Sequence, residues 1–516
     1  MASEANGTAP LGNTSYARPP TFAAAGDTIP FLLDDEYHLF HLASPSNTLH
    51  FPSRVRCSWL RQRSKDLLTW TRDSDPVIPP GPSKDDPDGS GAWTGSAVLG
   101  PDGNLHIFYT GFNHPKGGVQ VILHAKSSDR EGSKFEKPLG PIRLETSSHL
   151  DMYESTDFRD PYVFYNEQES RFWMLVATRF SKGPYTSRGC VALLTSPDLE
   201  SWRVEEEPLY APNNIFCPEC PEMFTLGNGK WYLAYSRFSG PHAGTLYVVG
   251  ESPRGPFRSP RDGSGGRFDG RRWYAAKSCP KAGDRSKRIS FAWVHDFNQD
   301  DRKWLWGGSF TQPREISARP DGSLVMNPAP EFLSALQETT LNQTSLVDKD
   351  INAPSTTAVE RLSLPASGTA NTGGTQCLSF NIAHADAKSF GLLLNFNTDL
   401  RGYRLSFEPV AGDVFSVALI TDNPPLDDFW GMLTGIETPK LVDGPELVKH
   451  GAVKISNGPL RLVLHDDIVE FFVDGKVITY RLLPRESDGT KEVFPVGAFV
   501  EDGSVQFKGL TFYKTV

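Results

Sequence analysis

The chain has 516 residues, which is too long for one ordinary hydrophobic core and predicts about two to four domains. Lys and Arg total 52 against 62 Asp and Glu, so the formal net charge is −10, and the chain has no basic tract. This balance argues against nucleic acid as a partner. Aromatic residues make up 11% of the chain, which indicates a β-rich core and offers side chains for stacking on sugars.

The N-terminal segment, residues 1–20, is polar and rich in Ala, Ser, Thr and Pro, and we expect a flexible tail there. It lacks the basic start and apolar core of a secretory signal, and no stretch of the chain is apolar for long enough to cross a bilayer. These features predict a cytoplasmic protein without a membrane partner, with secretion by an unconventional route as the alternative.

Candidate catalytic groups are three acidic residues, each beside a Gly or Pro at the edge of an apolar run: Asp27, Asp160 and Glu219. The backbone turns sharply at such positions. Cleavage of a glycosidic bond needs two carboxyl groups that flank a sugar ring, and a third can hold a ring hydroxyl. An isolated Asp or Glu is usually a solvated loop acid, but three in such fixed contexts favour a glycosidase.

Two sequence phrases recur in the first 300 residues. Ser-x-Asp-Leu-x-x-Trp occurs at Ser64–Trp70 and at Ser196–Trp202, and we interpret it as structural, with Asp capping a turn and Trp packing between sheets. A polar turn followed by an alternating, aromatic-rich strand recurs about every 60 residues, at Asp35–Ala43, Asp102–Gly111, Glu169–Thr178, Gly229–Ser236 and Lys287–Val294. Five such units can bury their faces against one another radially, so residues 21–337 predict a five-bladed β-propeller.

The pattern changes after the last copy of the repeat. Residues 338–356 are mostly polar with weak periodicity, as expected of a linker. From 357 to 516 about eight short alternating strands follow, with Asp474-Gly475 as a hairpin turn, which predicts a two-sheet β-sandwich. This part has no group of candidate carboxylates, so we expect it to support the propeller. A homodimer formed through the sandwich is one further expectation.

The six cysteines are scattered, which favours free thiols over disulfides. Cys217 and Cys220 have C-x-x-C spacing, but no second pair or His-rich segment follows them. No His, Cys and Asp cluster has metal-ligand spacing elsewhere in the sequence. We therefore expect neither a metal ion nor another cofactor.

Radial strands would allow the three acids to point into one axial funnel. A two-step displacement fits them best: Asp27 attacks the anomeric carbon, and Glu219 protonates the leaving oxygen and then activates water. Arg159 would keep the adjacent Asp160 ionised, so that this carboxylate accepts hydrogen bonds from sugar hydroxyls.

Several motifs resemble glycoside hydrolase family 32, the invertase, inulinase and levanase group. They are Arg159-Asp160-Pro161, Glu219-Cys220-Pro221 and the stretch Trp304–Ser317, and the similarity runs from about residue 26 to 330. The resemblance implies a five-bladed propeller with a C-terminal sandwich, and retaining, metal-free hydrolysis of terminal β-fructofuranosyl linkages in an oligosaccharide or small sugar. It matches Asp27 to the nucleophile, Asp160 to the transition-state stabiliser and Glu219 to the acid/base. The positions matched to the fructosyl pocket are Trp93, Ser96, Arg159 and Tyr274.

The departures from the family pattern gather near the first predicted blade. The usual Asn-Asp-Pro-Asn-Gly is replaced by residues 26–30 (GDTIP), a usual Gln by Leu42, and a small residue and a His by Leu60 and Arg61. The reaction type is therefore better supported than the sugar. The alternatives are a fructosyltransferase, a related propeller glycosidase acting on another furanoside such as an arabinofuranoside, and an inactive sugar-binding propeller.

Overall fold

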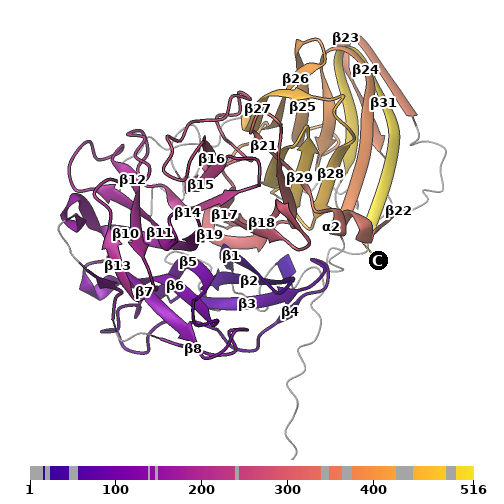
Figure 1. The fold of residues 1–516 in the computed structure, drawn as a ribbon. Coiled ribbons are helices and arrows are strands. Elements are labelled where there is room, and N and C mark those ends of the chain that lie inside the picture. Colours follow the sequence, from indigo (N-terminus) through magenta and orange to yellow (C-terminus); the bar gives the residue numbers. More distant parts are fainter. Residues whose placement is uncertain are drawn as a thin grey trace, which may run out of the picture. The chain divides into compact units, whose positions relative to one another are not determined.

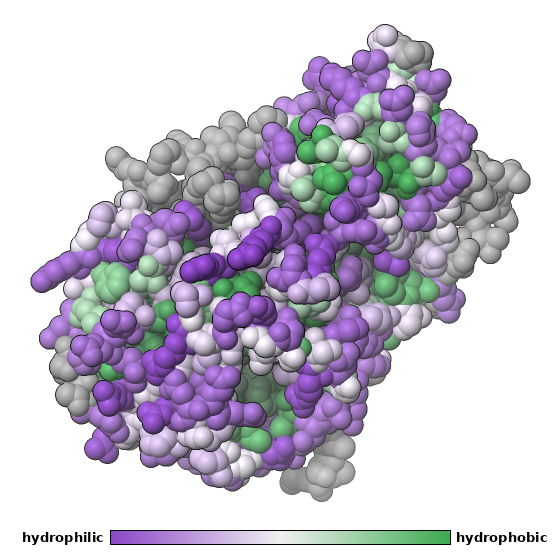
Figure 2. Space-filling model, turned by 45° about the horizontal axis from the view of Figure 1, so that its top comes forward, coloured by the Kyte–Doolittle hydropathy of each residue, from purple (hydrophilic) through white to green (hydrophobic). Residues whose placement is uncertain are grey.

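The computed structural model is almost entirely β (Figure 1), as the sequence predicts. The longest helix of the described residues, α2 (Pro330–Ala335), has only six residues. Hydrophilic residues cover most of the face drawn in Figure 2, and hydrophobic residues gather in smaller areas, including a hollow. The structure describes residues 16–17, 24–45, 56–137, 140–145, 149–238, 243–300, 302–338, 348–362, 375–425, 446–483 and 495–515.

The chain divides into two compact units. The first comprises Met1–Ser259, Tyr274–Asp296 and Leu305–Pro313, and the second comprises Pro260–Trp273, Phe297–Trp304 and Arg314–Val516. The second unit therefore includes three segments of the residues predicted as propeller, namely 260–273, 297–304 and 314–337. Most of the predicted tail lies outside the described residues. Of the predicted linker, the structure describes residue 338 and residues 348–356, and the latter belong to a strand.

Antiparallel meanders build the first unit, as the repeats predict. One sheet has the order β5 (Gly91–Leu99), β6 (Leu105–Asn113), β7 (Val119–Ser127) and β8 (Phe135–Glu136). A second has the order β10 (Tyr153–Asn166), β11 (Arg171–Phe180), β12 (Gly189–Ser196), β13 (Ser201–Val204) and β9 (Arg143–Leu144). A third is β14 (Glu219–Thr225), β15 (Trp231–Arg237) and β16 (Gly244–Gly250).

The remaining strands of this region pair in one path. Its order includes β4 (Thr71–Arg72), β3 (Ser58–Ser64), β2 (Glu36–Ala43), β1 (Ala25–Leu33), β19 (Lys303–Phe310) and β18 (Asp284–Asn298), and β17 (Trp273–Lys281) pairs with β18. The five aromatic-rich repeats predicted from the sequence form β2, β6, β11, β15 and part of β18. Each is thus the second strand of a consecutive group.

The two Ser-x-Asp-Leu-x-x-Trp phrases fold identically. Asp66 accepts backbone hydrogen bonds at 2.9 and 2.7 Å from the residues two and three positions later, and the indole of Trp70 donates to the Leu67 carbonyl at 3.1 Å. Asp198 and Trp202 make the same bonds in the second copy. Both indoles are fully buried. The structural interpretation of this phrase is confirmed.

The second unit has two sets of strands that diverge from one long strand, β24 (Thr375–Leu394). Its first part pairs with β28 (Leu460–His465), which leads to β29 (Ile468–Val473) and β30 (Lys476–Arg481). Its last part pairs with β25 (Tyr403–Ala411), followed by β26 (Val414–Thr421) and β27 (Glu446–Lys454). On its other edge β24 pairs with β31 (Val496–Thr515), which also pairs with β22 (Leu336–Glu338) and β23 (Asp348–Leu362).

Aromatic rings from both sets of strands meet in the core of this unit. Phe407 of β25 lies 5.9 Å from Phe471 of β29, measured between ring centroids. Phe380 and Phe390, from the two parts of β24, contact Phe471 and Phe407 respectively. The predicted turn at Asp474-Gly475 joins β29 to β30. Two sets of strands with a shared apolar core make a β-sandwich.

A buried ionic cluster lies beneath the strand pair β20 (Arg314–Ala318) and β21 (Leu324–Pro328) of the second unit. The Arg314 side chain is fully buried, and its guanidinium donates to Asp269 at 2.7 Å and to Glu470 at 2.6 and 2.9 Å. It also donates to the Thr479 hydroxyl at 2.6 Å and lies 4.6 Å from the Trp273 ring centroid. Arg314, which belongs to the family-like stretch Trp304–Ser317, therefore contributes to the packing of this unit.

Candidate active site

The first strands of consecutive sheets contact one another in chain order, β1 with β5, β5 with β10, and β10 with β14. Each of these strands has a shift in its pairing register: β1 between Ala25 and Thr28, β5 between Trp93 and Gly95, β10 in its middle between Arg159 and Tyr162, and β14 between Glu219 and Glu222. Such β-bulges bend a strand and re-aim its side chains. The side chains at the bulges, from segments far apart in sequence, therefore converge.

The backbone at these bulges is left-handed at several positions that carry a side chain. The φ angle is 58° at Asp160, 51° at Cys220 and, in β17, 49° at Ala275. Non-glycine residues rarely adopt this conformation, and it concentrates at functional sites. The repetition in three strands indicates that this arrangement of side chains is a built feature of the fold.

Asp27 in β1 is held by two donors from other strands. The Thr94 hydroxyl donates to its Oδ2 atom, and the indole Nε1 of Trp293 donates to its Oδ1 atom at 2.9 Å. Burial raises the pKa of Asp27 from 3.8 to about 6, and the neighbouring Asp160 adds to this rise, whereas the two hydrogen bonds oppose it. A carboxylate that is oriented in this way and ionised above about pH 6 can serve as a nucleophile.

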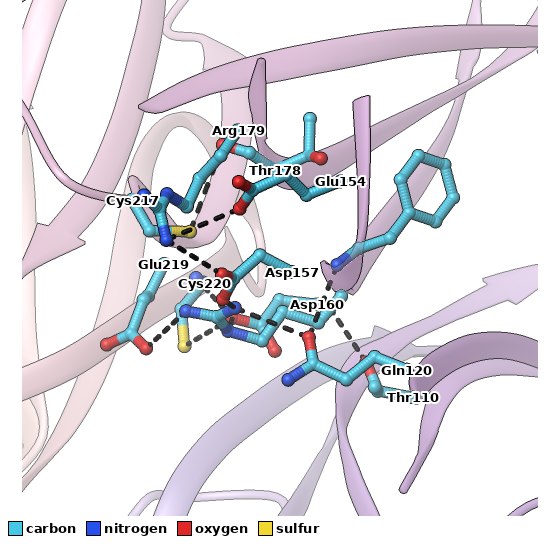
Figure 3. A network of polar contacts seen from close by, with 12 residues as sticks. Thr110, Gln120, Glu154, Asp157, Asp160, Thr178, Arg179, Cys217, Glu219 and Cys220 are labelled. Atoms are coloured by element: carbon cyan, nitrogen blue, oxygen red, sulfur yellow. Dashed lines mark hydrogen bonds and ion pairs between the residues drawn. The ribbon is translucent and has the colours of Figure 1, made fainter. Parts of the chain in front are cut away.

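Cys220 contacts both Asp160 and Asp27, and Figure 3 shows it beside Asp160. Its backbone N–H donates to Oδ2 of Asp160 at 2.9 Å, and its thiol sulfur lies 3.7 Å from the same oxygen and 3.8 Å from Oδ2 of Asp27. The backbone N–H of Asp160 donates in turn to the Thr110 hydroxyl at 2.8 Å. Asp160 is only 4% exposed, so these contacts fix its carboxylate beside Asp27.

The carboxylate of Glu219 in β14 accepts hydrogen bonds from a guanidinium and from a tyrosine hydroxyl. Arg159 donates to its Oε1 atom at 2.8 Å, and the Tyr274 hydroxyl donates to its Oε2 atom at 2.5 Å. Burial, and next the charge of Glu219, raise the pKa of Tyr274 well above its ordinary value, so the phenol stays protonated as a donor. Arg159 also donates to Asp157 at 2.5 Å and to Gln120 at 3.3 Å, which holds its guanidinium in place.

The structure thus joins five of the seven residues predicted for the site in one network of contacts: Asp27, Asp160, Glu219, Arg159 and Tyr274. Trp93 lies next to this network, because it immediately precedes Thr94, and its ring stacks on Phe112 at 4.0 Å. Ser96 has a different environment. Its hydroxyl accepts a hydrogen bond of 2.8 Å from the Val163 backbone N–H, which ties β5 to β10.

The structure explains some of the residues near the first predicted blade that depart from the family pattern. A Cβ atom on Gly26 would lie only 2.4 Å from the Trp306 ring and 3.3 Å from Cβ of Leu42, so the space beside Asp27 is filled by apolar side chains. Arg61 points elsewhere, because its guanidinium donates to Asp73 at 2.6 Å. The surroundings of Gly26, next to Asp27, are therefore apolar.

Four residues at the site were missed by the sequence reasoning. Thr94 and Cys220 stand inside motifs that were recognised, but no pattern showed that their side chains contact the acids. Trp293 lies in a strand that was predicted as a repeat, 266 residues from Asp27. Trp306 lies within the segment that resembles the family. The only sequence signal for its contact is that residue 26 is a glycine, which leaves room for a large ring.

Two further features of the chain concern metal ligands and membrane-spanning helices. Within the described ranges, no group of three or more His, Cys, Asp and Glu side chains could hold a metal ion. In the same part of the chain, no helix is long and apolar enough to span a membrane.

Residues 28–328 match the model of the glycosyl hydrolases family 32 N-terminal domain. The chain belongs to glycosyl hydrolase family 32. A β-fructofuranosidase, insoluble isoenzyme, of Arabidopsis thaliana is 25% identical over 314 residues, which cover 56% of this chain and 51% of that protein. A levanbiose-producing levanase of Bacillus subtilis is 22% identical over 507 residues, 93% of this chain and 86% of the levanase. The chain spans about half the length of the first curated relatives it matches.

Solved structures of family 32 show the same fold. Fructan 1-exohydrolase IIa from Cichorium intybus has a TM-score of 0.69 at 18% identity, with 100% of this chain and 98% of that chain covered. An exo-inulinase from Aspergillus awamori has a TM-score of 0.68 at 19% identity, with 97% and 98% covered. The fold is accordingly a β-propeller followed by a β-sandwich.

Proposed function

We propose that this protein is a retaining glycoside hydrolase that cleaves terminal β-fructofuranosyl linkages, of the sucrose or fructan type, through a covalent fructosyl-enzyme. The observation that carries the proposal is the network in which Asp27, Asp160 and Glu219 meet from three different strands. Membership of family 32, and relatives named as β-fructofuranosidases, fructan exohydrolases and a levanase, give the substrate class.

In this proposal Asp27 attacks the anomeric carbon and Glu219 protonates the leaving oxygen. A covalent fructosyl ester forms on Asp27 as the glycosidic bond breaks. Glu219, now a carboxylate beside Arg159 and Tyr274, removes a proton from water, which attacks the anomeric carbon and releases Asp27. Asp160 accepts hydrogen bonds from ring hydroxyls and stabilises the positive charge that develops on the sugar.

The proposed fructosyl pocket includes Trp93, Arg159 and Tyr274 around these acids. Ser96 contributes indirectly, since its bond to Val163 holds β5 against β10. Trp306 and Leu42 fill the space around Gly26, so the protein beside Asp27 is apolar on that side.

We also propose that the sheets beginning with β1, β5, β10, β14 and β17 are five propeller blades within residues 21–337. The support is that each group carries the aromatic-rich repeat in its second strand. The sandwich would then occupy residues 357–516, after a connection at 338–356. A location in the cytoplasm is supported by six buried cysteines that are all free. The homodimer stays a prediction.

The test is product analysis after incubation with sucrose, 1-kestose, inulin, levan and a pentofuranoside panel. The expected result is release of fructose with retained anomeric configuration, as monitored by NMR. Longer oligosaccharides as main products would identify a transferase, because a sugar hydroxyl would then replace water as acceptor. Release of arabinose, or an inverted anomer, would contradict the proposal.

A further inference from the structure

A cavity of about 820 Å³ lies in the first unit, away from the three acids. It is lined by residues that follow the acids along their strands, and its lining begins two residues after Asp27 in β1 and two residues after Asp160 in β10. A strand advances about 3.3 Å per residue, so the cavity lies toward the C-terminal ends of these strands. Its volume is within the range of ligand pockets, about 300–1,000 Å³.

Aromatic side chains from several strands line this cavity. They include Phe31 of β1, Tyr162 and Phe164 of β10 and Trp231 of β15, all partly exposed. Tyr165, which also lines the cavity, is 48% exposed. Aromatic rings left partly open to a cavity offer flat apolar faces to a ligand, and Tyr and Trp also carry a polar edge.

Lys277 lines the same cavity, and its ammonium has more N–H donors than the one acceptor it contacts. Its side chain is almost fully buried, and its ammonium donates to the Gly95 carbonyl at 2.8 Å. Within the described residues it forms no ion pair, and its other near neighbour is the Tyr162 ring, 5.7 Å from the nitrogen. An ammonium has three N–H groups, and a buried charge is costly unless its donors are satisfied. A hydroxyl oxygen in the cavity would satisfy them.

Charged groups of both signs surround the cavity, and some of them are already paired. Arg288 is already engaged, because it donates to the Ser278 hydroxyl at 2.7 Å and lies 3.9 Å from Glu222. The other charged lining residues are two cations, Lys277 and Arg285, and two acids, Glu167 and Glu251. Glu251 is likewise engaged, because Lys230 donates to it at 2.5 Å. Donors and acceptors combined with aromatic faces match a polyhydroxylated ligand.

We propose that this cavity is a second, non-catalytic carbohydrate site, which binds a short oligosaccharide with one sugar ring against Trp231 and Phe164 and a hydroxyl on Lys277. The site uses none of the three acids, so binding there does not depend on the proposed hydrolysis. It would hold part of a carbohydrate on the protein while the catalytic pocket releases its product.

The experiment is calorimetric titration of the Glu219→Gln protein with 1-kestose. Two binding events are expected, one at each site. Adding Trp231→Leu should weaken one of them at least tenfold, whereas Trp231→Phe, which keeps a ring, should preserve both. Arg285→Ala changes an exposed side chain at the cavity and provides a second variant, with an expected weakening of a few-fold.

Failure of this site and failure of the proposed function give different results. If Trp231→Leu and Arg285→Ala leave every kestose binding event unchanged, the second site is refuted even where sucrose is hydrolysed. If kestose binds once and Trp231→Leu removes that event, the second site holds and fructosidase function fails. Displacement of the Trp231-dependent event by inorganic phosphate would show an anion site and overturn the proposal. So would the absence of any kestose binding.

Discussion

The indole of Trp293 donates a hydrogen bond of 2.9 Å to Asp27, across 266 residues of sequence. This bond favours the ionised form of a carboxylate whose pKa burial raises to about 6. It therefore does two things: it orients one oxygen of the proposed nucleophile, and it keeps more of the nucleophile charged at neutral pH.

Replacing Trp293 by Phe should move the acidic limb of the kcat/KM profile to higher pH by about one unit. The lost hydrogen bond to a charged group is worth about 1.5–3 kcal/mol, and one pKa unit corresponds to about 1.4 kcal/mol. The measurement is kcat/KM for sucrose from pH 4 to 8, which reports groups of the free enzyme. Trp202→Phe is the matched control, because that indole donates to a backbone carbonyl in a turn. A profile unchanged in Trp293→Phe would contradict the role.

Asp27→Asn should abolish activity and yet stabilise the fold at neutral pH. Activity should fall by at least about 10²–10⁴ because the covalent route is lost. The pKa of Asp27 is raised in the folded protein, so the folded state binds more protons between pH 4 and 6 and wild-type stability falls as pH rises through that window. The variant lacks this loss, and its free energy of unfolding at pH 7 should exceed the wild-type value by about 1–3 kcal/mol.

Urea unfolding at pH 4 and pH 7 checks this prediction. The two proteins should differ less at pH 4, where Asp27 is mostly protonated in the folded state. A variant that is less stable than the wild type at pH 7 would show that Asp27 supports the fold.

Local patterns in the sequence were enough to predict the strands and the Ser-x-Asp-Leu-x-x-Trp turns, because both depend on contacts between residues close in sequence. The meeting of Asp27, Asp160 and Glu219 followed only from the repeat and the family resemblance. The bulges could not be predicted, since a register shift depends on the partner strand. For that reason the contacts of Thr94 and Cys220 with the acids were not foreseen.

Arg314→Met should destabilise the second unit by about 3–5 kcal/mol. The substitution leaves Asp269 and Glu470 buried without their cation, and breaking a buried ion pair from one side has this order of cost. Arg319→Met is the control, because its ion pair with Asp474 is partly exposed and should contribute at most about 1 kcal/mol. Thermal unfolding, monitored by circular dichroism, gives the loss of stability in both variants. Equal losses in the two variants would contradict the buried-charge argument.

Activity should be unchanged after dialysis against EDTA, because the proposed steps are complete with carboxyl groups. The measurement is the initial rate on sucrose before and after dialysis, with readdition of Ca²⁺, Mg²⁺ or Zn²⁺ as the control. Activity that is lost and then restored by one of these ions would show a metal requirement.

Glu219 and Glu222 both lie in β14 and both carry a carboxyl group. Substituting each in turn should show which of the two donates the proton. Simple strand alternation predicts opposite faces for residues three apart, but the register shifts between these two. Glu219 contacts Arg159 and Tyr274, whereas Glu222 accepts hydrogen bonds of 2.9 Å from both the backbone N–H and the hydroxyl of Ser278. Glu222 is 2% exposed and is therefore a buried acid that contacts Ser278 rather than solvent.

Glu219→Gln should therefore lose far more activity on an alkyl fructoside than on an activated aryl fructoside, because a poor leaving group needs the proton most. A loss of about 10²–10⁴ is expected on the alkyl substrate. Glu222→Gln keeps an acceptor for Ser278 and should reduce both rates by a smaller and similar factor. The measurement is kcat/KM for the two substrates in each variant. A leaving-group-dependent loss in Glu222→Gln, with none in Glu219→Gln, would reverse the assignment of the proton donor.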